Sequence, residues 1–133
     1  METQSKRLSF LIAGLLLAFV SFRAAAGSSQ MGSDLYRQYC SVCHGVHGAG
    51  DGPVADALST RPADLTRLRA THSGKFPELR VMAVLRGEDT PVHGRRQMPN
   101  WGQLFLDEAG GHREVVQIRG YALLKYIEQL QIP

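Results

Sequence analysis

The chain contains little of several residue types that mark common classes of protein. Among its 133 residues are two cysteines and one tryptophan, and after residue 26 its lysines are Lys75 and Lys125. So few lysines exclude a broad lysine-rich surface for an acidic partner. No internal repeat or low-complexity tract divides the sequence, and no segment has the pattern of a paired strand. We therefore expect a single domain of the all-α class.

The first 26 residues differ from the rest of the chain. Lys6 and Arg7 precede an apolar run at residues 8–20, and three alanines follow at 24–26. This order is typical of a secretory signal peptide. The alternative is an uncleaved membrane anchor facing the periplasm, but the run is shorter than the ~20 apolar residues of a membrane span. We expect cleavage after residue 26, leaving residues 27–133 as an exported domain without a membrane span.

Most of the positive charge belongs to this N-terminal segment. The whole chain has a net charge of +3, from 15 basic and 12 acidic residues. Residues 1–26 hold three of the basic residues and one acidic residue, so 12 basic and 11 acidic residues remain in 27–133. A nearly neutral domain lacks the basic surface that nucleic-acid binding requires. We therefore expect no nucleic-acid partner.

Both cysteines lie in one short motif, Cys-Ser-Val-Cys-His, at residues 40–44. The spacing of Cys40, Cys43 and His44 is that of a covalent haem c attachment site, in which each thiol forms a thioether with a haem vinyl group. His44 would then bind the iron through Nε2. The alternatives are a thioredoxin-like thiol pair, a structural zinc site and a simple disulfide. The first lacks a preceding strand, the second lacks another ligand pair, and the third is awkward at this spacing.

Apolar periodicity and turn residues predict helices joined by long loops. Ser33 or Asp34 is expected to cap the first helix. The expected helices cover residues 33–43, 54–58, 77–87 and 113–130. Glycine and proline are frequent between these helices, and the expected irregular segments are residues 45–53, 59–66 and 88–103.

With these features the sequence resembles the small bacterial monohaem c-type cytochromes, over residues 31–132. The resemblance starts from the motif at 40–44 and extends to the glycine-rich segment at 44–53. It also includes the positions at which the first and last helices of this family cross, here Gly32, Tyr36, Leu123 and Tyr126. The resemblance implies a cytochrome c fold. In that fold the N- and C-terminal helices cross, and three to five helices with long loops surround one haem c.

The second axial ligand of the iron is expected from the same resemblance. Residues 98–101, Met-Pro-Asn-Trp, are similar to the distal-ligand loop of the family, which makes Met98 the expected ligand. A thioether is a soft ligand that raises the reduction potential, and Pro99 would stiffen the loop. His93 is the rival ligand, and an open site is the third alternative. Met82 fits a core position on a helix instead.

His44 needs a partner for its second ring nitrogen. A metal-bound histidine usually donates its other N–H to an oxygen, which fixes the tautomer and the orientation of the ring. In the family a proline carbonyl on the proximal side accepts this bond. Pro62 is the residue that most resembles this proline, and Pro53 is the second candidate.

Three further residues are candidates for contact with the haem. Trp101 would donate its Nε1–H to a propionate, or else be an ordinary core residue. Arg61 or Arg95 would pair with a propionate, or else lie solvated on the surface. Together with Arg96, Arg95 would also form a small basic docking surface.

The resemblance implies a carrier of single electrons rather than an enzyme. A haem with two axial ligands leaves no position for peroxide or oxygen. The expected partners are redox proteins of the periplasm. The protein itself is expected to be a monomer or a subunit of a larger complex. The alternatives are a haem enzyme or gas-binding cytochrome with an open distal site and, from another class, a haem-free thiol oxidoreductase.

Overall fold

The computed structural model describes residues 27, 29–88 and 98–132, and these residues form helices and loops without a strand. The all-α prediction is therefore confirmed. Residues 29–39 form the N-terminal helix. The elements that follow are α2 (Ser41–His44), η1 (Ala55–Ala57), η2 (Leu65–Arg67), η3 (Ala70–His72), α3 (Glu78–Leu85), α4 (Trp101–Glu108) and α5 (Arg113–Gln129). None of the described helices is long and apolar enough to cross a membrane. The expected signal peptide lies outside the described residues.

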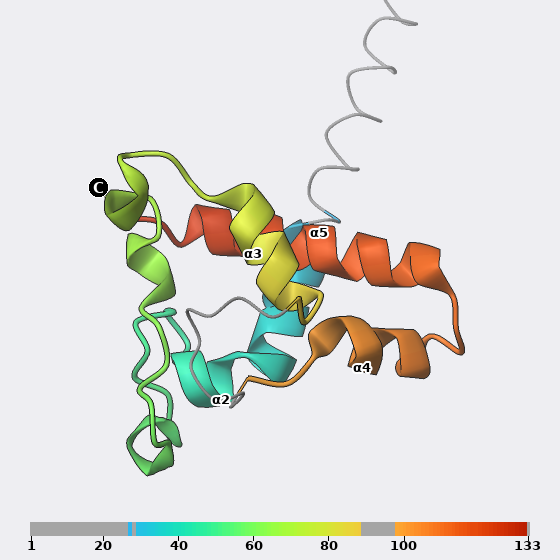
Figure 1. Ribbon diagram of the computed structural model, residues 1–133, viewed down its shortest axis with the longest axis horizontal. Helices are drawn as coiled ribbons and strands as arrows, with labels where there is room; N and C mark the ends of the chain where they lie inside the picture. The colour runs from blue at the N-terminus through green and yellow to red at the C-terminus, as the bar shows by residue number, and fades with distance from the viewer. Residues whose placement is uncertain (1–26, 28, 89–97, 133) are drawn as a thin grey trace, which may run out of the picture.

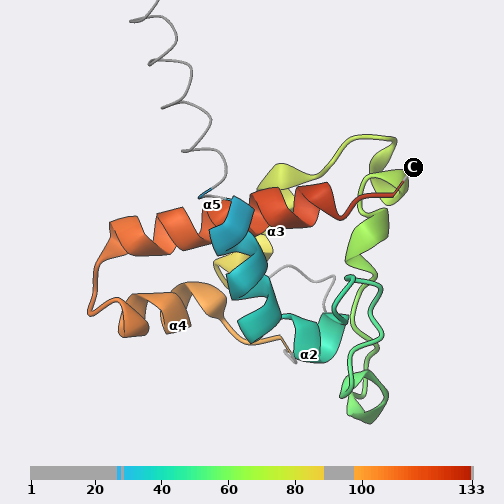
Figure 2. The same ribbon diagram turned by 180° about the vertical axis from the view of Figure 1, so that it is seen from behind.

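The long helix α5 is the centre of the arrangement. It lies between α3, which is in front of it in Figure 1, and the N-terminal helix, which crosses it on the other side and is in front in Figure 2. α4 runs beside α5 and joins it through a short turn. The three 3-10 turns and their loops gather at the end of the molecule where the C-terminus lies. The predicted crossing of the first and last helices is confirmed.

Gly32 makes the crossing possible. A Cβ atom at this position would overlap the Ala122 carbonyl oxygen of α5 and would lie 2.9 Å from Tyr126 Cβ. One turn later, the rings of Tyr36 and Tyr126 pack with their centroids 5.1 Å apart. The two backbones therefore approach so closely that only glycine fits at residue 32, because it has no side chain to displace.

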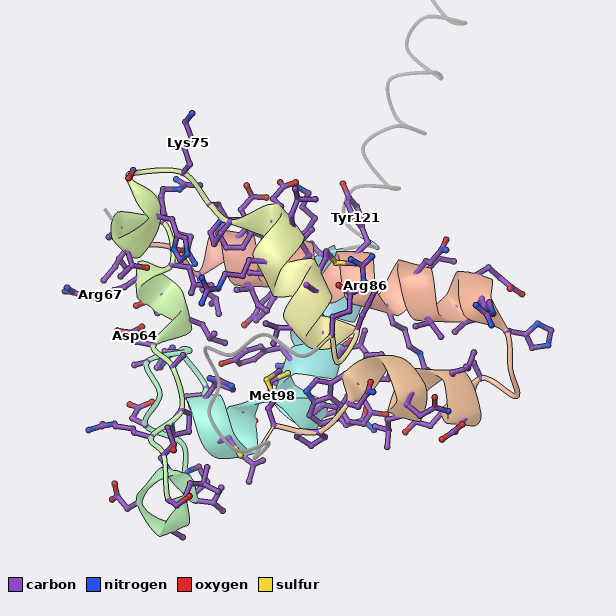
Figure 3. All side chains as sticks on the ribbon, in the orientation of Figure 1. Asp64, Arg67, Lys75, Arg86, Met98 and Tyr121 are labelled. Atoms are coloured by element: carbon purple, nitrogen blue, oxygen red, sulfur yellow. The ribbon has the colours of Figure 1, made fainter. Side chains whose placement is uncertain are left out.

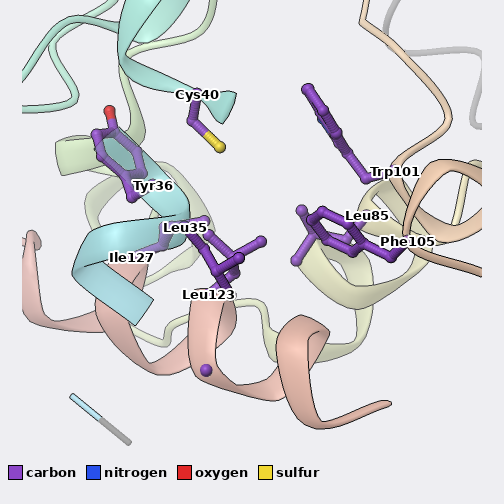
Figure 4. Packing of buried hydrophobic residues seen from close by; sticks show 9 residues of the cluster. Leu35, Tyr36, Cys40, Leu85, Trp101, Phe105, Leu123 and Ile127 are labelled. Carbon is purple, nitrogen blue, oxygen red and sulfur yellow. The ribbon is translucent and has the colours of Figure 1, made fainter. Parts of the chain in front are cut away.

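The core lies between the N-terminal helix, α3, α4 and α5. Its buried apolar side chains come from all four helices, and they include Leu35, Leu85, Phe105, Leu123 and Ile127. Figure 4 shows that Cys40 and Trp101 stand at one edge of this cluster. Burying each large apolar side chain contributes about 1.5–3 kcal/mol, so this cluster is the main source of stability.

The third and final helices were predicted well. α3 follows Pro77 and is succeeded by Gly87, whose φ of 73° fits the left-handed position after a helix. α5 begins and ends within one residue of its predicted bounds. The 3-10 turn η1 falls inside the predicted short helix at residues 54–58.

Three predicted helix boundaries were wrong. The first helix ends at residue 39 rather than 43, and α2 follows it after Cys40. Neither Ser33 nor Asp34 caps the first helix, because the chain is already helical at residue 29. Ser33 Oγ instead donates to the Gln30 carbonyl at 3.0 Å, and Asp34 pairs with Arg37 at 2.6 Å. The prediction of an irregular segment up to residue 103 was also wrong, since α4 begins at residue 101. The Asn100 side chain caps this helix by accepting from the Gln103 N–H at 3.0 Å.

Candidate functional site

A single tight turn presents the three residues of the haem motif. The N-terminal helix ends before Cys40, and α2 follows at once. The Cys40 carbonyl accepts hydrogen bonds from the N–H groups of Cys43 (3.1 Å) and His44 (2.9 Å). Both thiols are free rather than joined in a disulfide, and they line the same cavity as the His44 imidazole. The motif therefore points three potential ligands into one space.

The cavity has two adjoining lobes between α2, the loops and α3. Including their open mouths they enclose about 640 and 1030 Å³, a size suited to a cofactor. The smaller lobe brings together every described residue that was predicted to contact the haem, namely Cys40, Cys43, His44, Arg61, Pro62, Met98 and Trp101. Four of these, Cys40, His44, Arg61 and Met98, also line the larger lobe. Arg95, Arg96 and the rival ligand His93 lie outside the described residues.

The orientation of His44 is fixed by a backbone carbonyl. His44 Nδ1 lies 2.9 Å from the Ala63 oxygen. Because a carbonyl oxygen can only accept, Nδ1 carries the proton and Nε2 carries the lone pair that binds a metal. The predicted acceptor, Pro62, was therefore wrong by one residue. The Pro62 oxygen instead packs against Gly50, where a Cβ atom would overlap it.

The loop that supplies this carbonyl is tied to the glycine-rich segment after the motif. The N–H of Leu65 donates to the Gly48 oxygen at 2.7 Å, and the N–H of Gly50 donates to the His44 oxygen at 2.9 Å. Gly48 and Gly50 have φ values of 83° and 76°, which favour glycine. These bonds hold Ala63 in place beside His44.

Met98 enters the cavity from another part of the chain. It lies between α3 and α4 in sequence, is half-buried, and packs against the core cluster. Figure 3 shows it in the middle of the molecule beside α2. Met82 differs, because it is a residue of α3 that packs on Gly120 of α5, with its Cε 3.4 Å from a Cβ built there. Met98 is thus a methionine of the cavity, whereas Met82 joins two helices.

Trp101 has an unusual polar atom. Its side chain is 8% exposed, and its Nε1–H is buried without a hydrogen-bond acceptor among the described residues. Its ring packs edge-on against Tyr39, with centroids 5.4 Å apart, and both rings line the smaller lobe. Since a buried donor without an acceptor is costly, the indole suits a ligand that carries an acceptor.

The surroundings of Cys40 do not suit thiol redox chemistry. Burial, followed by the nearby Cys43, raises the pKa of the Cys40 thiol to about 12. Thiol oxidoreductases need the opposite, because their attacking cysteine is a thiolate whose pKa is lowered. A buried thiol at the edge of an apolar cavity fits covalent attachment of a cofactor better.

Three residues of the site were missed by sequence reasoning. Ala63 contributes through its backbone, which leaves no trace in the residue type. His72 and Arg80 line the larger lobe. Arg80 lies on the polar side of an amphipathic segment, where an arginine is expected whether or not it faces a cavity. Only the tertiary arrangement of α3 relative to α2 identifies it.

The donor set and the walls of the cavity fit a haem. Two thiols and an imidazole lie on one side, a thioether comes from a different segment, and an apolar surface surrounds them. The family model for cytochrome c oxidase, cbb3-type, subunit III, matches residues 28–110, more than half of the chain. No curated protein and no solved structure gives a significant match. The chain therefore belongs to this family, whose domain is a c-type cytochrome that transfers electrons.

Proposed function

We propose that this cytochrome binds one haem c through thioether bonds to Cys40 and Cys43, with His44 and Met98 as the axial ligands of its iron. The observation that carries the proposal is the shared cavity, which is lined by all four of these side chains. The haem would supply an iron that alternates between the ferric and ferrous states. The family implies haem c in general, and the residues named here are the specific part of the proposal.

Each proposed ligand has a separate effect on the iron. The Ala63 carbonyl holds the His44 imidazole in the tautomer whose Nε2 carries the lone pair, and it increases the basicity of the ring. The Met98 thioether favours the ferrous state and raises the reduction potential. The apolar walls limit the access of water, so that little solvent reorganises when the charge changes.

We also propose that the protein is an electron carrier or an electron-transfer subunit and not an enzyme. With both axial positions filled, no position remains for a substrate. Its partners would be redox proteins that meet it as a monomer or within a complex. Residues 1–26 would be a cleaved signal peptide, so that residues 27–133 act in the periplasm, which agrees with the usual export of c-type cytochrome domains.

The mass of the exported protein tests attachment and cleavage together. We expect the intact mass of residues 27–133 plus one haem, because both thiols and the export signal are present. Haem staining should persist on a denaturing gel, since thioether bonds survive unfolding. The Cys40→Ala/Cys43→Ala double variant should lose the stain. A stain that disappears on denaturation of the unmodified protein would contradict covalent attachment.

The identity of the distal ligand is tested by two methionine substitutions. Met98→Ala should abolish the long-wavelength absorption band that the family resemblance implies for a methionine-ligated ferric haem. It should also let carbon monoxide bind rapidly to the reduced protein, because a coordination position opens. Met82→Ala is the matched control and should keep the band. Rapid and complete binding of carbon monoxide to the unmodified protein would instead support an open distal site.

A further inference from the structure

The larger lobe of the cavity is lined by two positively charged side chains and a histidine. Arg61, His72 and Arg80 line it, and none of its described lining residues is Asp or Glu. The remaining wall is mostly apolar, with side chains that include Leu65, Leu68, Val81, Val84, Leu85 and Ile127. Such a lobe suits a ligand that is apolar over most of its surface and anionic at one edge.

The pairing of the arginines supports this assignment. Four arginines elsewhere are paired with carboxylates at 2.6–3.8 Å, namely Arg37, Arg67, Arg86 and Arg119. Among the residues that the structure describes, the arginines without an ion pair are Arg61, Arg69, Arg80 and Arg113. Of these, Arg61 and Arg80 line the larger lobe. Arg61 makes one long contact, from its Nε to the Gly50 oxygen at 3.4 Å.

The carboxylate closest to Arg80 in sequence is already engaged. Glu78 lies two residues earlier in α3 and accepts a hydrogen bond from Lys125 Nζ at 3.2 Å. Lys125 also binds Glu128 at 2.7 Å, so this cluster joins α3 to α5 away from the cavity. Glu78 is therefore not a partner of Arg80, whose exposed side chain lines the larger lobe.

We propose that Arg80 of α3, together with Arg61 of the preceding loop, binds the carboxylate groups of the haem in the larger lobe. The inference rests on the proposed function, since it needs a haem in this cavity. Guanidinium groups bind carboxylates through two parallel N–H donors, which favours arginine for such contacts. His72 lines the same lobe, and its Nδ1 donates to the Leu68 oxygen at 2.8 Å.

The location distinguishes this inference from the expected role of Trp101. Trp101 lines only the smaller lobe, whereas Arg80 lines only the larger one. An indole N–H offers one neutral donor, but two arginines offer two positive charges to a group with two negative charges. We therefore infer that Arg80 has a larger electrostatic effect on the haem than Trp101.

The test is the reduction potential of the holoprotein as a function of pH. Arg80→Gln should lower the potential, because removing a positive charge near the iron favours the ferric state. The change in potential that accompanies loss of a proton from a haem carboxyl group should also move to higher pH. A carboxyl group that loses its neighbouring cation has a higher pKa. Arg61→Gln should shift both quantities in the same directions, and Trp101→Phe should shift them less.

Two further variants provide the controls. Arg80→Lys keeps the charge and should retain most of the unmodified potential. Arg67→Gln removes the same charge from a residue that does not line the cavity, is paired with Asp64, and points away from the molecule in Figure 3. Its effect should be small, because solvent screens an exposed charge.

The outcomes separate this inference from the proposed function. Shifts for Arg80→Gln and Arg61→Gln that are no larger than the shift for Arg67→Gln, in a protein with normal haem and an intact methionine band, would overturn the inference alone. Absence of covalent haem from the unmodified protein would overturn both.

Discussion

The helical frame and the loop wall of this cytochrome are built from different kinds of buried residue. The helical frame, which comprises the N-terminal helix, α4 and α5, buries large side chains such as Tyr36, Phe105 and Leu123. The loop wall, residues 45–76, buries only small residues: Gly45, Gly48, Gly50, Gly52, Ala55 and Thr66. The frame is therefore stabilised by apolar burial, whereas the wall depends on hydrogen bonds and on glycine conformations.

The two regions therefore contribute differently to the stability of the protein and to the properties of the site. The loop wall contributes little apolar area, yet it contains the Ala63 carbonyl that orients His44. The frame carries most of the core and also lines the smaller lobe of the cavity, through Tyr39 and Trp101. We therefore expect changes in the frame to affect mainly the free energy of unfolding. Changes in the wall should alter the haem spectrum and potential at a smaller cost in stability.

The largest expected effect concerns the crossing of the frame helices. Gly32→Ala should destabilise the protein by roughly 3 kcal/mol, because the new methyl group overlaps the Ala122 carbonyl and forces two packed helices apart. Chemical denaturation of the holoprotein measures this change.

Gly120→Ala is the matched control for this crossing. A Cβ atom at Gly120, also buried in a helix of the frame, meets only Met82 Cε at an ordinary 3.4 Å. The free energy of unfolding of the Gly120→Ala variant should stay constant or rise by up to about 1 kcal/mol, because alanine has a higher helix propensity than glycine. Equal stabilities for the two variants would show that the close crossing is not what holds the frame together.

The next effect, in the loop wall, should be smaller in stability but visible in the haem. Gly50→Ala places a methyl group against the Pro62 carbonyl at a residue with a φ of 76°. We expect a loss of about 2 kcal/mol from the contact and the backbone conformation together. The reduction potential should also shift, because the segment that carries the Ala63 carbonyl must move away from His44.

Gly74→Ala isolates the contribution of the contact. Gly74 has a φ of 78°, but a Cβ atom there would meet nothing within 4 Å. The substitution should lower the free energy of unfolding by about 1 kcal/mol, because alanine is strained in this left-handed backbone conformation. It should leave the reduction potential unchanged. A potential that responds equally to both substitutions would rule out a specific link between Gly50 and the haem ligand.

The same comparison explains what the sequence predicts and what it does not. The frame was largely predictable, because apolar periodicity gives α3 and α5, and the resemblance identifies Gly32 and Tyr36 at the crossing. α4 was missed because its start is signalled by a single capping residue, Asn100, at the end of a segment rich in glycine and proline. Such short caps are weak signals beside the surrounding composition.

The site was predictable only where a side chain carries the chemistry. The cavity brings together Cys40, Cys43, His44 and Met98, although their roles as haem ligands stay predictions. The acceptor for His44 was placed one residue away, because any residue can present a carbonyl. Arg80 carried no sequence signal at all, since a cavity between two elements exists only after they have packed.

The smallest expected effect concerns the bond that links the two regions. The Tyr36 hydroxyl of the frame donates to the Gly45 carbonyl of the loop wall at 2.8 Å. Tyr36→Phe should cost about 1 kcal/mol at neutral pH, since the Gly45 oxygen retains the Gly48 N–H at 3.2 Å as a donor. Tyr126→Phe is the control, because its ring packs on Tyr36 but its hydroxyl forms no hydrogen bond with a described residue.

The pH dependence of stability makes this last prediction specific. Burial raises the pKa of Tyr36 in the folded protein. The unfolded chain, with a tyrosine pKa of about 10, then loses its proton first as the pH rises. Stability is therefore lost above about pH 10, and Tyr36→Phe should remove this part of the loss. Urea denaturation at several pH values measures this loss. If the free energy of unfolding falls equally above about pH 10 in the unmodified protein and in the Tyr36→Phe variant, ionisation of Tyr36 does not cause the loss.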